Sequence, residues 1–168
     1  HCNDSDPIIL LKCFKKYQLA FISKKENQSM FVIGPMMHKL QCQLINREND
    51  REALKTILNC IKILKEDKAS IAVFPEGGIL SEDGKLHHFR PGVFKIAQKA
   101  ETPIVVLSIT GTEQISKKTP FQPTDVYLDV LEVFSNIKET KTELIGTAAR
   151  RLMETNIERR ELLWQKDM

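Results

Sequence analysis

The sequence lacks any run of eighteen consecutive apolar residues, the length that a helix needs to cross a lipid bilayer. It also lacks the residue order of a secretory signal peptide at its start. Its four cysteines lie far apart, with no C-x-x-C pair and no histidines at ligand spacing, so we expect reduced thiols and no metal site. We therefore expect contact with a membrane only at its surface, or through a membrane-anchoring segment outside this sequence.

Two glycine-rich signatures of nucleotide binding, G-x-x-x-x-G-K-[ST] and G-x-G-x-x-G, are missing as well. Lysine and arginine together number 25, and aspartate and glutamate number 22. An excess of three positive charges is too small for a dedicated nucleic-acid-binding protein, so we expect no nucleic-acid partner. The charge remains compatible with an anionic substrate or a mildly acidic membrane surface.

The 168 residues, 42% of them hydrophobic, suffice for one compact domain, which we expect to comprise residues 1–168. Apolar patterns typical of strands and of helices alternate along the chain. The predicted strands are residues 19–23, 42–45, 70–74, 103–110 and 125–134. The predicted helices are residues 8–17, 50–64, 91–100 and a long segment after residue 140. This alternation predicts an α/β layered sandwich with a mostly parallel central sheet flanked by helices.

Capping signals mark three of the predicted helix starts. Pro7 suits a first helical position, with Asp6 as its N-cap. Asn49 and Glu52 resemble a capping box, and Thr140 with Glu143 resembles another. Five apolar residues after Asn49 recur at helical spacing down one face: Leu54, Ile57, Leu58, Ile61 and Leu64. A Gly-Pro pair at residues 34–35 is expected to interrupt the apolar segment around it.

Polar residues follow two of the predicted strands. The first strand end, "LINR", closes on Arg47, and the second, "VFPEGG", contains Glu76. Because the carboxyl ends of parallel strands meet at one edge of a sheet, Arg47 and Glu76 are predicted neighbours. Gly77 and Gly78 give the backbone freedom to approach a ligand and offer N–H groups to an oxyanion or phosphate. A plain turn explains the two glycines equally well.

His1 and Asp6 are separated by four residues. If the loop between them folds back, the carboxylate can hold the imidazole in the tautomer that accepts a proton. A substrate hydroxyl could then attack an activated acyl donor directly, without an enzyme nucleophile. From spacing alone, an exposed histidine and a helix-capping aspartate are the commoner explanation.

Four segments, in this order, resemble the four sequence blocks of the glycerolipid acyltransferases, the family of 1-acylglycerol-3-phosphate acyltransferase. They are "HCNDSD", "LINR", "FPEGG" followed by "SEDGKLHHFRPGVFKIA", and "TPIVVLSITGT", within residues 1–112. The resemblance implies that His1 and Asp6 form the H-x-x-x-x-D catalytic pair, with His1 as base. It also implies that Arg47, Glu76 and Gly77 bind the acceptor and that Pro103 belongs to the acyl donor region.

The third block departs from the family pattern, because Gly78 and Ile79 stand where threonine and arginine are usual. One phosphate-binding guanidinium is therefore missing, and Lys85 and Arg90 are the nearest cations that could replace it.

The family resemblance implies an O-acyltransferase of phospholipid biosynthesis, most directly for 1-acylglycerol-3-phosphate as acceptor. It further implies acyl-CoA or acyl carrier protein as donor, and no metal or other cofactor. The alternatives are a catalytically weak lipid-binding homologue and an acyltransferase for another lyso-lipid head group.

Apolar and basic side chains are mixed in the first predicted helix. The apolar ones are Ile8, Leu10, Leu11, Phe14 and Tyr17, and the basic ones are Lys12, Lys15 and Lys16. Such a helix can lie on a membrane or pack on the sheet, and the same holds for the Met36–Met37 segment. We expect the protein to associate with membranes, with its active site on the cytoplasmic side.

Overall fold

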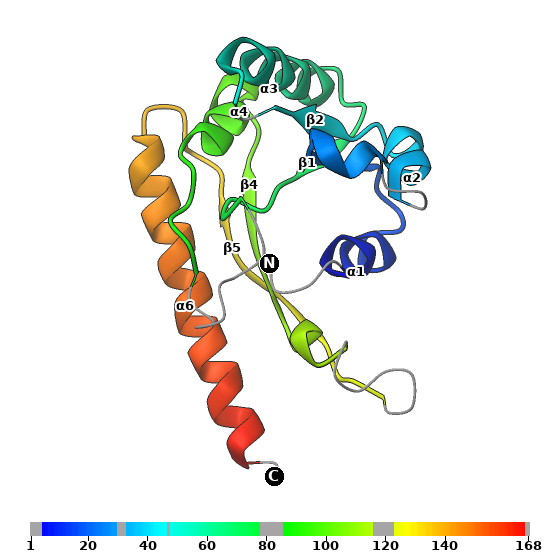
Figure 1. The fold of residues 1–168 in the computed structure, drawn as a ribbon. Coiled ribbons are helices and arrows are strands. Elements are labelled where there is room, and N and C mark those ends of the chain that lie inside the picture. The colour runs from blue at the N-terminus through cyan, green and yellow to red at the C-terminus, as the bar shows by residue number, and fades with distance from the viewer. Residues whose placement is uncertain (1–4, 30–32, 47, 78–85, 116–122, 167–168) are drawn as a thin grey trace.

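The computed structural model describes residues 5–29, 33–46, 48–77, 86–115 and 123–166 of the chain. Figure 1 shows the arrangement of its helices and strands. The helices are α1 (Asp6–Cys13), α2 (Ile33–Lys39), α3 (Asp50–Lys65), α4 (Gly92–Ala100) and α6 (Thr142–Lys166), with 3₁₀ helices η1 (Lys25–Ser29) and η2 (Thr112–Gln114). The strands are β1 (Leu19–Lys24), β2 (Gln43–Ile45), β3 (Ser70–Ala72), β4 (Ile104–Thr110) and β5 (Tyr127–Phe134).

The strands form one parallel sheet and one antiparallel ribbon. β1 lies in the centre of the parallel sheet, paired with β2 on one side and β3 on the other. This confirms the predicted α/β fold with a parallel sheet flanked by helices. β4 instead pairs antiparallel with β5, from Ile104 opposite Phe134 to Thr110 opposite Tyr127. The apolar run of β4 indicates burial but carries no information on strand direction, so the antiparallel pairing departs from the mostly parallel sheet that the sequence predicts.

The β4–β5 ribbon separates two apolar cores, with α6 along one side of it and α1 on the other (Figure 1). The larger core joins α4, α6 and Val106 of β4. The smaller core joins Leu10 of α1 to Leu19 and Phe21 of β1, with Leu107 of β4 packed against them. Because neighbouring strand residues point to opposite faces, β4 supplies one residue to each core in turn.

The helix starts agree with the sequence signals in part. The Asn49 side-chain oxygen accepts hydrogen bonds from the backbone N–H groups of Arg51 and Glu52, at 3.1 and 3.2 Å, so the predicted cap is confirmed. The Glu52 carboxylate accepts a hydrogen bond from the Asn46 amide at 3.1 Å and lies 3.5 Å from Lys25 Nζ. Glu52 therefore ties α3 to the segments after β1 and β2.

Three other predicted helix starts are shifted in the structure. Ser5, not Asp6, holds the N-cap position of α1, and its carbonyl accepts the hydrogen bond of Ile9 N–H at 3.1 Å. Pro91 likewise occupies the N-cap position of α4. Helix α6 begins at Thr142, two residues after the predicted cap. Propensity defines helix ends only to within a residue or two, because caps and first-turn residues share the same preferences.

The Gly-Pro pair at residues 34–35 does not interrupt a helix but lies in the first turn of α2. A proline is tolerated there because the first turn has no use for its missing N–H. A side chain at Gly34 would collide with the backbone carbonyl of Gln28, so glycine lets α2 pack closely on η1.

The predicted apolar face of α3 is only partly buried. Leu54 and Leu58 are 56% and 57% exposed, whereas Thr56 and Cys60 are buried. The Thr56 hydroxyl donates to the Leu44 carbonyl at 2.6 Å and so joins α3 to β2. Burial raises the pKa of Cys60 to about 12, which keeps this thiol protonated and inert at neutral pH.

Helix α6 is held on β5 by an ion pair of low exposure. Arg160 Nε and the Asn156 amide donate to Asp129 Oδ2 at 2.9 and 3.0 Å. The Arg160 guanidinium also lies 4.2 Å from the centre of the Tyr127 ring. The Arg160 hydrogen bond lowers the pKa of Asp129, so this carboxylate stays charged well into the acid range.

Candidate active site

Asp6 is the first residue of α1 and is 1% exposed. Aspartate is rarely this deeply buried unless its carboxylate is paired or hydrogen-bonded. The start of a helix also favours negative charge through the helix dipole. The location of Asp6 thus differs from the solvated cap that the sequence alone left open.

Helix α1 is fixed by Leu10, one turn after Asp6. Leu10 is buried against Leu19 and Phe21 of β1, and Phe74, which follows β3, packs against the same cluster. Asp6 therefore lies one helical turn before Leu10 of this cluster, and Glu76 lies two residues after Phe74. Ile109, from the fourth of the family-like blocks, packs there too. The segments that carry Leu10, Phe74 and Ile109 thus meet at one small core.

Glu76 lies in a tight turn after β3 and is 8% exposed. The Gly77 N–H donates to the Phe74 carbonyl at 3.1 Å, and Gly77 has a φ of 77°, a left-handed conformation that favours glycine. The Gly77 N–H is thus engaged within the turn. What Gly77 contributes to the site is the backbone conformation that positions Glu76.

The chain returns to this turn at residues 86–90. Leu86 and Phe89 are both buried in the larger core. The Arg90 N–H donates to the Pro75 carbonyl at 3.1 Å, and the Arg90 residue is exposed. Of the two cations predicted to compensate for the missing guanidinium, Arg90 thus lies beside the Glu76 turn. Sequence reasoning missed the anchoring by Leu86 and Phe89, because two apolar residues in a charged segment show no periodicity.

Four predicted site residues lie outside the described residues: His1, Arg47, Gly78 and Lys85. The proximity of Arg47 to Glu76 stays a prediction, as does the pairing of His1 with Asp6. Strands β2 and β3 flank β1 in parallel, so Ile45 and Ala72, their last residues, are at the same edge of the sheet. In the sequence, Arg47 comes shortly after Ile45, and Glu76 comes shortly after Ala72.

Pro103 does not lie at the Glu76 turn. It is exposed and follows the carboxyl end of α4, whereas Arg90 precedes the start of that helix. The 9 residues of α4 span roughly 13 Å at about 1.5 Å per residue. The predicted donor residue is therefore separated from the Glu76 turn by the length of α4.

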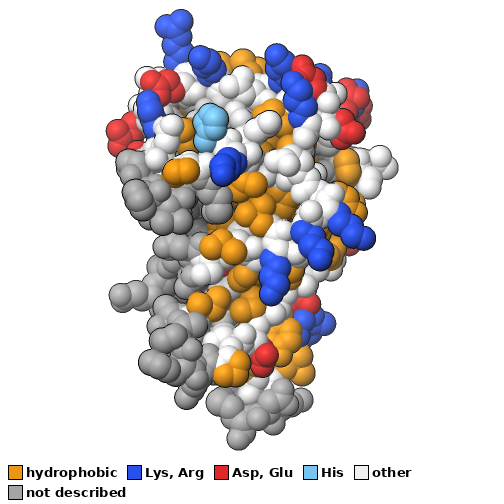
Figure 2. Space-filling model, turned by 90° about the vertical axis from the view of Figure 1, so that its right-hand side faces the viewer, with side chains coloured by type: hydrophobic (Ala, Val, Ile, Leu, Met, Phe, Trp, Pro, Cys, Tyr) orange, Lys and Arg blue, Asp and Glu red, His pale blue; other side chains and the backbone are white. Residues whose placement is uncertain are grey.

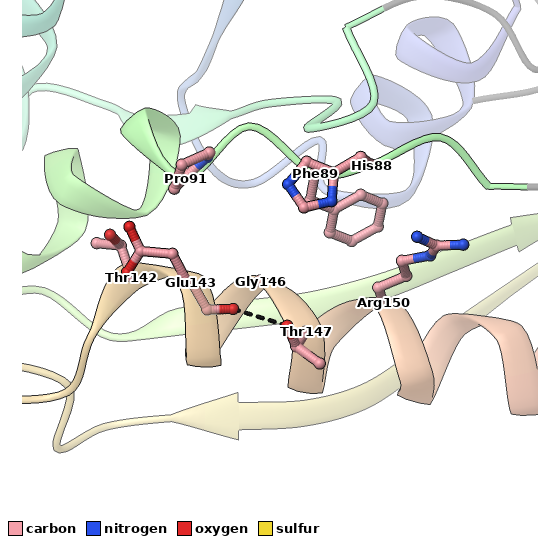
Figure 3. Close-up of a pocket in the computed structure, with 8 residues that line it drawn as sticks. All are labelled: His88, Phe89, Pro91, Thr142, Glu143, Gly146, Thr147 and Arg150. Atoms are coloured by element: carbon pink, nitrogen blue, oxygen red, sulfur yellow. Dashed lines mark hydrogen bonds between the residues drawn. The ribbon is translucent and has the colours of Figure 1, made fainter.

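A small cavity lies between residues 88–91 and the first turns of α6 (Figure 3). In this view, His88 and Phe89 lie over the helix, and the Thr147 hydroxyl donates to the Glu143 carbonyl at 2.9 Å. The cavity has a volume of about 90 Å³, far below the roughly 300–1,000 Å³ of typical ligand sites. It is lined by none of the predicted site residues, and we regard it as a packing gap.

No group of three His, Cys, Asp or Glu side chains that could hold a metal ion occurs within the part of the chain that the structure describes. None of the described helices is both long and apolar enough to cross a membrane.

Comparison with known proteins gives several matches. "Probable 1-acyl-sn-glycerol-3-phosphate acyltransferase" of Mycoplasma genitalium is 33% identical over 117 residues, 67% of this chain and 42% of that protein. "1-acyl-sn-glycerol-3-phosphate acyltransferase BAT2, chloroplastic" of Brassica napus is 33% identical over 115 residues, 68% of this chain and 32% of that protein. The chain thus spans less than half the length of these two relatives.

The fold resembles the crystal structure of the 1-acyl-sn-glycerophosphate acyltransferase PlsC from Thermotoga maritima. The TM-score is 0.73 at 22% identity, over 96% of this chain and 64% of that one. At this identity the likeness supports the fold alone. The model of the family described as "Acyltransferase" matches residues 1–110, which include Asp6, the Glu76 turn and β4. The chain therefore belongs to the acyltransferase family.

Proposed function

We propose that the protein transfers an acyl group from a thioester donor to the free hydroxyl of 1-acylglycerol-3-phosphate, giving phosphatidic acid in phospholipid synthesis. The observation that carries the proposal is the burial of Asp6 at the start of α1, within the segment that matches the acyltransferase family. The names of the relatives from Mycoplasma genitalium and Brassica napus support the choice of acceptor.

In the proposed reaction, the His1 imidazole removes the proton from the acceptor hydroxyl while the oxygen attacks the thioester carbonyl. The C–O ester bond forms, the C–S bond breaks, and the imidazolium returns its proton to the departing thiolate. Asp6 holds the imidazole in the accepting tautomer and stabilises its charged form. The donor is acyl-CoA or acylated carrier protein, and no step requires a metal or another cofactor.

The phosphate of the acceptor is assigned to the cations around the Glu76 turn. Arg90 is the cation among them that lies within the described residues, and the sequence suggests Arg47 and Lys85 as two more. Glu76, which is buried in this turn, orients these cations or the glycerol hydroxyl in the proposed complex. Gly77 and Gly78 allow the backbone to approach the head group.

Replacing Arg90 by glutamine is expected to raise KM for 1-acylglycerol-3-phosphate about 10- to 100-fold, because a hydrogen bond to a charged group contributes about 1.5–3 kcal/mol. KM for the thioester should stay within about twofold. The measurement is steady-state kinetics with 1-acylglycerol-3-phosphate and with a choline lyso-lipid as acceptors. Arg151→Gln, which removes an exposed guanidinium on α6, is the matched control.

An equal rise of both KM values would assign Arg90 to the fold of the turn rather than to the acceptor. A preference of the wild-type protein for the choline head group would favour the alternative acceptor, to which Ile79 in place of arginine also points.

We further propose that the protein acts at a membrane surface. In α1 and the turn after it, Leu10 is buried, but Ile8 and Tyr17 are 56% and 67% exposed. Lys12, Lys15 and Lys16 are exposed beside them. Figure 2 views the side of the molecule that carries α1 and α2, where apolar side chains gather in the middle of the face with Lys and Arg side chains around them. An apolar patch flanked by lysines suits an anionic lipid surface.

Changing Lys12, Lys15 and Lys16 together to glutamine is expected to weaken binding to anionic vesicles about tenfold or more, since each lysine near such a surface contributes about 1 kcal/mol. Vesicle sedimentation measures the effect, with neutral vesicles as the control. Unchanged binding to anionic vesicles would rule out α1 as the contact.

A further inference from the structure

A cleft lined by none of the proposed catalytic or acceptor-binding residues lies between α3, α4 and the turn after β5. It has a volume of about 440 Å³. Its lining residues, here called the lysine cleft, are Lys65, Lys95, Gln98, Lys99, Glu101 and Lys138. They come from three separate elements, so no local motif in the sequence marks them.

The lysine cleft carries a concentrated positive charge. Lys138 Nζ lies 2.9 Å from Glu101 Oε1, and this hydrogen bond lowers the pKa of Glu101. The charge of Lys65 also lowers the pKa of Glu101. Within the described residues, no side-chain ion pair is found for Lys95 or Lys99. Four lysines and one glutamate leave an excess of +3, as large as the formal net charge of +3 of the whole chain. Ammonium groups gathered on a concave surface attract anions more strongly than the same groups spread over the protein.

The two walls of the lysine cleft are fastened together. The Gln98 side-chain amide donates to the carbonyls of Ile137 and Thr140, both at 2.6 Å. These bonds hold the turn that carries Lys138 against α4, and Ile137 is buried in the larger core. The cleft is therefore a feature of the packed fold rather than of mobile side chains alone.

The lysine cleft lies away from the Glu76 turn. Helix α3 ends at Lys65, shortly before β3 begins at Ser70, so Lys65 is at the amino-terminal edge of the parallel sheet. Glu76 follows the opposite edge. Helix α4 connects the two regions, with Arg90 before its start and Lys99 in its last turn, over roughly 13 Å.

We propose that the lysine cleft binds the clustered phosphates of a nucleotide, the chemistry that a CoA thioester presents at the end remote from its sulfur. The volume falls within the roughly 300–1,000 Å³ of small-molecule sites, and a concave site of this size is unlike the broad surface of a protein interface. The net charge of +3 on the lining residues of the cleft matches the charge of several phosphates. The assignment to the donor rests on the proposed function; the binding of nucleotide phosphates does not.

The test of binding is calorimetry with free CoA, with adenosine 3′,5′-bisphosphate and with pantetheine, which has no phosphate. The variant Lys65→Gln, Lys95→Gln, Lys99→Gln is compared with Lys39→Gln, Lys55→Gln, Arg151→Gln, which removes the same charge from exposed positions elsewhere. We expect the cleft variant to bind both phosphate-bearing probes at least about tenfold more weakly, the control within about twofold of wild type, and pantetheine to bind no variant measurably. Equal binding of the two phosphate probes by the cleft variant and the control would overturn the proposal.

Kinetics separate the donor from other phosphate sources. KM for acyl-CoA should rise about tenfold in the cleft variant, with KM for the acceptor unchanged. Weaker nucleotide binding without a change in this KM would refute the donor assignment, since the cleft then serves a free nucleotide. A loss confined to acyl carrier protein as donor would contradict the proposal in favour of a protein partner. If the wild-type protein binds CoA through the cleft but transfers no acyl group, the proposed function fails and the cleft assignment stands.

Discussion

Replacing Asp6 by asparagine is expected to lower kcat for acyl transfer about 10²–10⁴-fold, the range that a positioned base contributes. Asparagine has nearly the same shape, but its amide is neutral and cannot stabilise the imidazolium that forms on His1. Asp6 is 1% exposed, so solvent does not reach its side chain to screen the loss of the charge. KM for the acceptor should change little, because Asp6 acts on the base rather than on the lipid.

The matched control for this prediction is Asp50→Asn. Asp50 is the first residue of α3, as Asp6 is of α1, but it is exposed. Both changes remove a charge from a helix start, which costs about 0.3–1 kcal/mol of stability. Only Asp6→Asn should reduce turnover, as measured by the rate of thiol release at saturating substrate. A comparable loss in both variants, or an Asp6→Asn protein that retains more than about a tenth of the wild-type rate, would contradict the catalytic role.

Replacing Phe89 by alanine is expected to lower the free energy of unfolding by about 3–5 kcal/mol, as measured by urea denaturation. Phe89 is 3% exposed and packs in the larger core with Phe94, Val106 and Ile145. It also directly precedes Arg90, whose N–H holds the Pro75 carbonyl. The variant should therefore raise KM for the acceptor as well, because the cavity loosens the Glu76 turn.

Phe134→Ala separates the two effects of this change. Phe134 packs against the same core from β5, where it pairs with Ile104 of β4, and is half-buried. It should cost stability while leaving KM for the acceptor within about twofold of wild type. If both phenylalanine variants change KM equally at a temperature where both are folded, residues 86–90 have no specific part in positioning Glu76.

Local signals in the sequence were sufficient for most elements. The cap at Asn49 and the strands around residues 19–23 and 42–45 follow from side-chain chemistry and apolar patterns within a few residues. Gly77 lies in a turn with a left-handed backbone, which is one of the two explanations that the sequence leaves open. These features depend on interactions within one segment, which is why the sequence alone predicts them.

Features that depend on distant partners were not predictable in the same way. The burial of Asp6 requires the packing of Leu10 on β1, and the exposure of Leu54 and Leu58 depends on which side of α3 the sheet covers. The antiparallel course of β4 depends on β5, since apolar content is the same for either direction. The lysine cleft joins three elements far apart in the sequence, and its charge is visible only after folding.

The most direct test of the central claim is mass spectrometry of the lipid product formed from 1-acylglycerol-3-phosphate and an isotope-labelled acyl thioester. We predict that the wild-type protein yields phosphatidic acid carrying the labelled acyl chain as an ester on the formerly free hydroxyl. The Asp6→Asn protein should yield at most about a hundredth of this amount in the same time, and Asp50→Asn should yield the wild-type amount. Absence of labelled phosphatidic acid with the wild-type protein, or equal yields from the wild-type and Asp6→Asn proteins, would contradict the account.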